Sequence, residues 1–205
     1  MLYDYLYQTY GVNTPIFTCE IQYKDYSDSW LFTELNKLCG NGELARFEKG
    51  VYYIPTDTIL GKSILPAEDV IEKRYIQNGN EIFGFYGGIG FMNRIGLSTQ
   101  VVSCDTIYTN NESSRKRKVR VGSLDVILKK PRVYITNENA NTLAFLELMT
   151  DIPEWYFSDE EKMETVVFYI KSKKIARDDI VKYIGEYPDK TSKKLIESEL
   201  IFNAA

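Results

Sequence analysis

The feature that most constrains the fold of this chain is the run from Gly42 to Pro55, which directly follows a segment with leucines at helical spacing. Two short β-prone stretches lie within this run, at residues 44–47 and 51–54. They are expected to fold back on each other at Lys49-Gly50, because glycine tolerates the backbone conformation of a tight turn. A helix followed at once by such a hairpin is typical of the end of a winged helix-turn-helix domain.

The residues upstream of this run predict the other helices that such a domain needs. Leu2, Leu6 and Tyr10 recur at helical spacing and predict a first helix. The cluster Asn13-Thr14-Pro15 ends it, and residues 17–23 are expected to form a second helix. Three short helices would then share one buried face.

The third helix is the one expected to read DNA. Ser27 or Asp28 is expected to cap its start, and Gly40 or Gly42 its end. Its inner face is lined by Leu31, Leu35 and Leu38. Its outward face then carries the candidate groove-reading side chains, which are Ser29, Thr33, Asn36 and Lys37. On the hairpin, Arg46 and Lys49 are expected to meet phosphate or the minor groove.

Charge is distributed unevenly along the chain, whose formal net charge is -4. Residues 1–58 carry 4 basic and 8 acidic side chains, residues 59–140 carry 12 and 8, and residues 141–205 carry 9 and 13. Phosphate contacts supply most of the non-specific affinity for DNA. An acidic N-terminal domain can therefore bind DNA if its acidic groups lie away from the DNA face, or if the middle segment supplies cations.

The densest positive charge lies between two β-prone stretches, residues 101–109 and 119–128, which are expected to form a hairpin. Its five cations are Arg115, Lys116, Arg117, Lys118 and Arg120. A hairpin with this charge is suited to phosphates or to an acidic surface on a partner protein. The alternative is a solvated hairpin that has no ligand.

The sequence shows no recognisable catalytic pattern. It has no histidine, and Cys19, Cys39 and Cys104 lie too far apart for zinc spacing or a disulfide framework. The stretch Gly122-Ser-Leu-Asp125 is similar to the start of a nucleotidyltransferase site, but Ile127 stands where the second carboxylate is needed. We therefore expect no catalytic site, no metal and no cofactor.

The sequence also predicts a soluble, cytoplasmic protein. No apolar run approaches the ~20 residues of a membrane-spanning helix, and the N-terminus lacks the basic-then-apolar layout of a secretory signal. Cysteines without a disulfide pattern fit a reducing compartment.

Two segments resemble the AbiEi family of antitoxins, which belong to type IV toxin-antitoxin systems of abortive infection, a form of phage defence. They are the helix-to-wing run from Leu31 to Pro55, and the segment from Gly84 to Leu97 with Thr99-Gln100 and a strand after it. The resemblance covers about residues 1–150. It implies a winged helix, then a helix of glycines and small residues, then strands with a basic hairpin.

The resemblance also implies a function with two parts. The winged helix of such a protein represses its own operon, and the C-terminal region neutralises a nucleotidyltransferase-like toxin without necessarily forming a stable complex. The implied partners are therefore operator DNA and the cognate toxin, with no membrane. The alternative is a protein-binding module, or a stand-alone transcriptional regulator, whose winged helix contacts a partner protein rather than DNA.

Helical periodicity returns beyond Pro131, in four segments at residues 142–152, 158–172, 177–184 and 191–202. We expect an α+β protein with a winged helix-turn-helix over residues 1–58 and a mixed α/β antitoxin domain over residues 59–205. A helical bundle begins in the second domain at about residue 141. The bundle is expected to complete the core, and the alternative is that it forms a homodimer or partner surface.

Overall fold

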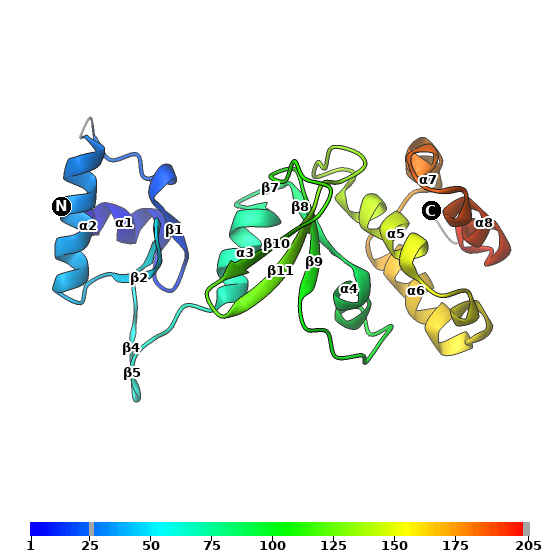
Figure 1. Cartoon of the computed structure of the whole chain (residues 1–205), viewed down its shortest axis with the longest axis horizontal. Helices are drawn as coiled ribbons and strands as arrows, with labels where there is room; N and C mark the ends of the chain where they lie inside the picture. Colours follow the sequence, from blue (N-terminus) through cyan, green and yellow to red (C-terminus); the bar gives the residue numbers. More distant parts are fainter. Residues whose placement is uncertain (25–26, 203–205) are drawn as a thin grey trace. The chain divides into compact units, whose positions relative to one another are not determined.

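The computed structural model describes residues 1–24 and 27–202 and has a mixed α+β fold (Figure 1). It divides into two compact units, Met1–Lys73 and Arg74–Ala205. In the described ranges, no helix is both long and apolar enough to cross a bilayer.

The first unit contains a small antiparallel sheet whose strand order is β1-β3-β2. Two helices, α1 and α2, supply apolar side chains to the same core as this sheet. The elements are α1 (Leu2–Tyr10), β1 (Ile16–Phe17), the 3-10 turn η1 (Thr18–Glu20), α2 (Asp28–Gly40), β2 (Ala45–Glu48), β3 (Val51–Tyr53), β4 (Asp57–Thr58) and β5 (Gly61–Lys62).

Helix α2 follows the sequence pattern closely. Leu35 is fully buried in the core of the first unit, and Leu31 and Leu38 are half-buried against it. The Ser27 hydroxyl accepts a hydrogen bond from the Trp30 amide at 3.4 Å, which satisfies one of the free N–H groups at the helix start. The predicted start and end of this helix are confirmed, as are the first helix and the two strands of the hairpin.

Removal of this cap gives a small, measurable loss of stability. We expect Ser27→Ala to lower the free energy of unfolding of the first unit by about 1 kcal/mol, because the Trp30 amide loses its acceptor. Ser27→Asp should retain most of the stability, since a carboxylate caps equally well. Urea unfolding followed by circular dichroism measures both variants, and equal losses for alanine and aspartate would contradict the capping role.

The predicted helix over residues 17–23 is wrong. Ile16 and Phe17 form strand β1 instead, paired with Tyr52 and Val51 of β3, and only Thr18–Glu20 makes a short 3-10 turn. Both strand residues are buried, and the Thr18 amide donates to the Gly50 carbonyl at 3.0 Å, which extends the pairing. Non-local burial against the hairpin therefore outweighs the local helical pattern.

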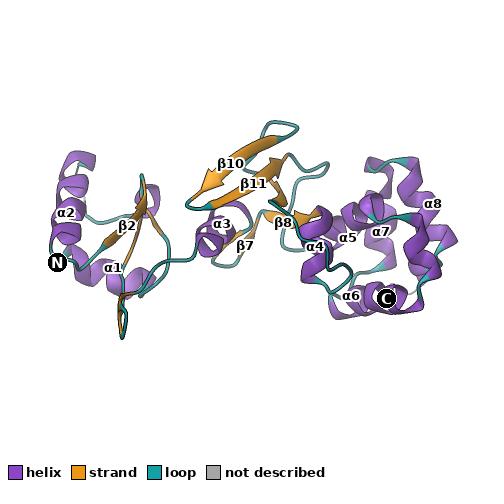
Figure 2. Cartoon of the chain, turned by 60° about the horizontal axis from the view of Figure 1, so that its bottom comes forward, coloured by secondary structure: helices purple, strands orange, loops and turns teal. Residues whose placement is uncertain are grey.

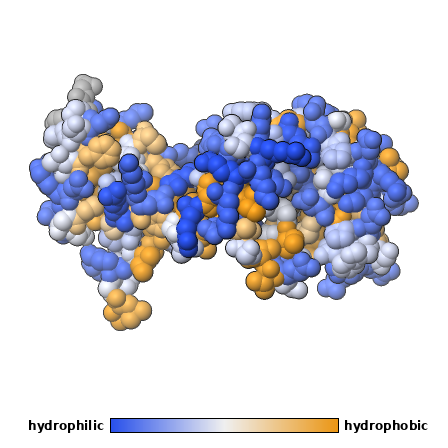
Figure 3. All heavy atoms as spheres, viewed as in Figure 1, coloured by the Kyte–Doolittle hydropathy of each residue, from blue (hydrophilic) through white to orange (hydrophobic). Residues whose placement is uncertain are grey.

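Strands β4 and β5 form a separate hairpin with an apolar tip. Ile59 and Leu60 lie at its turn and are essentially fully exposed, which is visible as hydrophobic colour at the end of the hairpin (Figure 3). The Thr58 hydroxyl donates to the Gly61 carbonyl at 2.7 Å and accepts from the Leu60 amide, so the turn is held by its own hydrogen bonds.

The second unit is built on a four-stranded sheet with strand order β10-β11-β9-β8. Helix α5 and the helices that follow it form a bundle beside the sheet (Figure 2). The first elements are α3 (Ala67–Tyr75, which begins in the first unit), β6 (Gln77–Asn78), β7 (Glu81–Ile82), β8 (Gly84–Gly87), α4 (Gly88–Arg94), β9 (Asp105–Thr109), β10 (Arg117–Val121) and β11 (Leu124–Lys129). The bundle consists of α5 (Ala140–Asp151), η2 (Glu154–Ser158), α6 (Glu160–Ser172), α7 (Arg177–Tyr183), η3 (Ile184–Glu186), α8 (Asp189–Glu197) and η4 (Leu200–Phe202).

The strands do not form the hairpin that the sequence predicts. Residues 119–128 turn back at Gly122, whose φ of 54° suits a tight turn, and give two strands, β10 and β11, instead of one. Strand β11 then inserts next to β9 and runs parallel to it. Residues 117–120 thus lie in the edge strand β10, and residues 115–116 directly precede it. Strand β11 lies between β10 and β9.

Helix α5 is the centre of the bundle. Of its 12 residues, all but Asn141 and Asp151 are buried, and Phe145 and Leu146 are fully enclosed. A helix that is apolar on almost every face must be covered on every face, which is why α8, α7, α4 and β8 all pack around it. Of the four helical segments predicted beyond Pro131, three are confirmed within about two residues at each end, and the fourth divides into α8, which ends at Glu197, and the short 3-10 turn η4.

The segment Gly84 to Leu97 differs from the helix implied by the resemblance. Residues Gly84–Gly87 form strand β8, and α4 occupies only Gly88–Arg94. The glycines of this segment serve close packing: a Cβ at Gly87 would lie 2.6 Å from the Tyr108 ring, and one at Gly90 would lie 2.0 Å from the Asp105 carboxylate.

Candidate nucleic-acid interface

The outward face of α2 carries the four side chains that the sequence singles out. Ser29, Thr33, Asn36 and Lys37 are all exposed, at helical spacing, opposite the leucines that hold the helix to its core. The Thr33 hydroxyl donates to the Ser29 carbonyl at 2.8 Å, so it remains free only to accept. The Asn36 amide makes no hydrogen bond to any residue in the described ranges, and it therefore offers both donors and an acceptor.

Lys37 is partly neutralised by a neighbour on its own helix. Its ammonium pairs with the carboxylate of Glu34, one turn earlier. About two-thirds of the Lys37 side chain is exposed and about a quarter of that of Glu34, so the lysine is the more accessible partner. An exposed pair of this kind contributes little stability and can exchange for a phosphate contact.

The hairpin after α2 starts directly from the helix end. The Glu43 and Leu44 amides donate to the Leu38 carbonyl at 3.0 and 3.2 Å, which ties the first residues after the helix to its last turn. Arg46 on β2 is exposed and lies close enough to Cys39 to lower the pKa of that thiol, although burial raises it overall. Arg46 therefore lies beside the C-terminal part of α2.

Lys49 lies at the turn between β2 and β3 and is exposed. Gly50 beside it has a φ of 79°, and a Cβ there would lie 3.3 Å from the Thr18 hydroxyl. The Arg46 Nε donates to the Glu48 carbonyl at 3.3 Å, and the strand pairing is irregular between these residues. The turn thus presents Lys49 outward on a hairpin that is anchored to β1.

An aromatic cavity that the sequence reasoning missed adjoins Lys37. It has a volume of about 350 Å³, and its lining includes Tyr3, Tyr23, Trp30 and Lys37. Tyr23 and Trp30 stack with ring centroids 6.0 Å apart and an interplanar angle of 13°. Trp30 and Lys37 are seven residues apart, which is two helical turns. This spacing places both side chains on one face of α2, and it was the sequence signal that could have revealed the cavity.

The five cations of residues 115–120 lie in the second unit, where three of them are paired. Arg117 contacts Glu112 at 2.7 Å, Lys118 contacts Asp125 at 2.9 Å, and Arg120 lies 3.8 Å from the same carboxylate. Figure 3 shows strongly hydrophilic atoms over the region of β10 and β11. The sequence could not reveal these partners, because Glu112 and Asp125 come close only through a turn and a strand pairing.

Glu112 is the most buried of these partners. Burial works to raise the pKa of its carboxyl, but hydrogen bonds from the Ser114 amide and the Arg117 guanidinium hold that pKa below its usual value. It therefore remains charged and keeps Arg117 in place. Arg115 and Lys116, which precede β10, form no ion pair with any described residue and are the cations most available to a ligand.

Residues 1–24 and 27–202 contain no group of three or more cysteine, aspartate or glutamate side chains placed to hold an ion.

The chain matches the model of DUF6088, a family of unknown function, over residues 21–174. This range is about three-quarters of the sequence, so the chain belongs to this family. The matched range contains α2, the hairpin that follows it and the cations of residues 115–120. No curated protein and no solved structure matches the chain.

Proposed function

We propose that this DUF6088 protein binds DNA through α2 and the β2-β3 hairpin of its first unit, in a winged-helix manner in which strand β1 and the 3-10 turn η1 stand where the middle helix of the motif was predicted. The proposal rests chiefly on one observation: the four polar side chains of the outward face of α2 are all exposed, while its opposite face is fixed by leucines. A helix held in this way can enter a major groove, where an asparagine reads adenine and hydroxyls contact either base or phosphate.

The charges of the first unit support a DNA contact at one part of α2. Asp28 lies in the first turn and opposes phosphate, whereas Lys37 lies in the last turn, and Arg46 lies beside this end of the helix. We therefore propose that the middle and C-terminal half of α2 contacts the bases, with Arg46 and Lys49 on the flanking phosphates. The acidic total of residues 1–58 predicts weak non-specific binding, so affinity depends on base contacts.

The test is a titration of a labelled duplex from upstream of the gene, followed by fluorescence anisotropy at several salt concentrations. We expect Lys37→Ala with Arg46→Ala to weaken binding at least about 10-fold and to reduce the slope of log K against log salt by about 2, one unit per phosphate contact. Asn36→Ala should instead reduce the preference for that duplex over a scrambled one by about 1–3 kcal/mol.

The matched control is Lys190→Ala, an exposed lysine of α8 in the second unit, which should bind like the unaltered protein. Absence of salt-dependent binding to any duplex at low salt would rule out the proposal. It would favour the alternative, in which the acidic first unit contacts a partner protein.

We further propose that the protein is the antitoxin of a type IV toxin-antitoxin pair, repressing its own operon and neutralising a nucleotidyltransferase-like toxin. This proposal rests on the resemblance of residues 31–55 and 84–97 to AbiEi antitoxins. Coexpression with the product of the adjacent reading frame tests it, with growth as the readout. If both the unaltered protein and the Lys37→Ala, Arg46→Ala double variant restore growth, toxin neutralisation does not depend on DNA binding and is separate from repression. Growth arrest that neither protein relieves would contradict the antitoxin role.

A further inference from the structure

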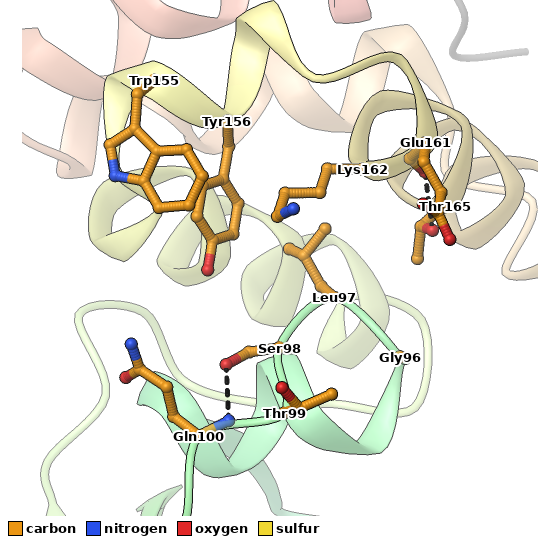
Figure 4. Close-up of a pocket in the computed structure, with 10 residues that line it drawn as sticks. All are labelled: Gly96, Leu97, Ser98, Thr99, Gln100, Trp155, Tyr156, Glu161, Lys162 and Thr165. Atoms are coloured by element: carbon orange, nitrogen blue, oxygen red, sulfur yellow. Dashed lines mark hydrogen bonds between the residues drawn. The ribbon is translucent and has the colours of Figure 1, made fainter.

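A cavity of about 360 Å³ opens in the second unit between the loop after α4 and the start of α6 (Figure 4). Polar residues of the loop, Ser98, Thr99 and Gln100, line one side. The aromatic side chains of Trp155 and Tyr156, from η2, line the opposite side. Its volume lies near the lower limit of small-molecule pockets, which span roughly 300–1,000 Å³, and this limits the ligand to a small one.

The aromatic wall is anchored at one ring and open at the other. Tyr156 is buried, and its ring meets that of Trp155 edge to face, with centroids 4.3 Å apart and an angle of 71°. The Trp155 side chain is nevertheless 60% exposed. A large aromatic ring that is fixed by a buried neighbour and still open to solvent is a ready surface for a second planar ring to stack on.

The charges around the cavity do not favour a phosphate. The Lys162 ammonium lies 5.4 Å from the centroid of Trp155 and 5.2 Å from that of Tyr156. It also pairs with the carboxylate of Asp159, and Glu161 adds a second negative charge to the lining. The local charge is therefore not positive, so the cavity suits a neutral ring rather than an anion.

The opposite wall offers hydrogen-bonding groups of both kinds. The Ser98 hydroxyl oxygen accepts from the backbone N–H of Gln100 at 3.2 Å, which leaves the hydroxyl proton free to donate. The side chains of Thr99 and Gln100 are exposed and make no hydrogen bond to any residue that the structure describes. A glutamine amide both donates and accepts, so it can bond the edge of a heterocycle that does the same.

We propose that this cavity binds a single nucleobase, stacked on Trp155 with its polar edge bonded by Ser98, Thr99 and Gln100. Stacking on an aromatic side chain accepts any base, whereas the hydrogen bonds select among bases by their edges. The base is that of a free nucleoside or of an unpaired position in a nucleic-acid strand. The site is in the second unit, so it is independent of the DNA contact proposed for α2.

The chain carries two tryptophans, Trp30 in the first unit and Trp155 in the second, and this allows a test with an internal control. In the NMR spectrum of the ¹⁵N-labelled full chain, each indole N–H gives one cross-peak, and Trp30→Phe assigns them. Adenosine, guanosine, cytidine and uridine are then titrated separately. We expect at least one to shift the Trp155 peak saturably, with a dissociation constant of about 1 mM or tighter. A saturable shift of the Trp30 peak alone would report the aromatic cavity of the first unit and would count against this site.

Gln100→Ala should weaken the binding of that nucleoside by about 3- to 10-fold, as expected for the loss of one neutral hydrogen bond. A short single-stranded oligonucleotide distinguishes the two sources: a shift with the oligonucleotide alone assigns the site to a base within a strand. Ribose 5-phosphate should cause no shift. The proposal is overturned if ribose 5-phosphate shifts the Trp155 peak as strongly as the nucleosides do, or if neither nucleosides nor the oligonucleotide shift it.

Discussion

Gly84→Ala is expected to destabilise the second unit by about 3 kcal/mol, the upper end of the usual range for forcing an extra methyl group into a packed site. A Cβ at this position would lie 1.9 Å from the Tyr75 carbonyl oxygen, 2.9 Å from the Tyr108 carbonyl oxygen and 3.0 Å from the Ile76 Cα. All three are backbone atoms, so none can rotate away as a side chain would. Relief requires a shift of β8, β9 or the end of α3.

Urea unfolding of the full chain, with a probe in each unit, measures this effect. Trp155 fluorescence, measured with Trp30→Phe, reports the second unit, and Trp30 fluorescence, measured with Trp155→Phe, reports the first. The transition of the second unit should move while that of the first does not. Gly185→Ala is the matched control, because a Cβ there meets nothing within 4 Å. Equal stability of the two variants would show that the backbone at residue 84 is not held as tightly as the structure has it.

Gly90→Ala provides an intermediate case. Its Cβ would lie 2.0 Å from an oxygen of the Asp105 carboxylate, which is a side chain but is fixed by Arg94 at 2.8 Å. Asp105 can move only if that ion pair breaks. Gly84, Gly87 and Gly90 therefore allow a strand and a helix to approach their neighbours closely.

Local patterns were sufficient to predict the elements that depend on local physics. The spacing of Leu31, Leu35 and Leu38, with Ser27 before them, located α2 almost to the residue, because a cap and an apolar stripe lie within one segment. Residues 17–23 were different. Their helical pattern was outweighed at its start by the pairing of strand β1 with Val51 and Tyr52, more than 30 positions away, and no local signal reports such a partner.

The same limit applies to the order of strands. A hairpin between residues 101–109 and 119–128 was the simplest arrangement, since neighbours in sequence usually pair. The early turn at Gly122 instead lets β11 insert beside β9 in parallel. Only the packing of the whole sheet selects this arrangement.

For the candidate interface, the sequence predicted which side chains are exposed but not which of them form ion pairs. Ser29, Thr33, Asn36 and Lys37 are on the outward face of α2, as helical periodicity requires. The ion pairs of Arg117 and Lys118, by contrast, depend on carboxylates that only the fold brings near. Such partners reduce the charge that is available to a ligand, so a count of cations along the sequence overestimates a basic patch.

Arg132→Ala is expected to lower the free energy of unfolding of the second unit by about 3 kcal/mol, the lower end of the range for breaking a buried ion pair. The Arg132 Nε lies 3.1 Å from a carboxylate oxygen of Glu147, which is 2% exposed on the central helix α5. The guanidinium itself is partly exposed, which is why the lower end applies. Without it, a buried carboxylate loses its nearest opposite charge.

Glu147 is already in an unfavourable position for a charged group. Burial raises the pKa of its carboxyl above the usual value, against the lowering effects of Arg132 and of a hydrogen bond from Tyr108. Because the folded-state pKa lies above the unfolded one, the folded state binds more protons between the two values. Stability therefore falls as pH rises through the folded-state pKa, and Glu147 opposes folding once it is ionised.

The direction of this pH dependence distinguishes two effects of removing Arg132, the loss of its ion pair and the loss of its packing. Removal of Arg132 raises the pKa of Glu147 further, so the deficit of Arg132→Ala should shrink as the pH falls from neutral toward the ordinary carboxyl range, where Glu147 is protonated. Adding Glu147→Gln to Arg132→Ala should restore at least half of the loss at neutral pH and remove its pH dependence, since an amide keeps the contact with Tyr108 without a charge. The contrary result is a loss of stability that is the same at every pH and that Glu147→Gln does not restore. Arg132 would then stabilise the bundle through its packing against Tyr187 and not through its charge. The ring centroid of Tyr187 lies 5.4 Å from the guanidinium carbon.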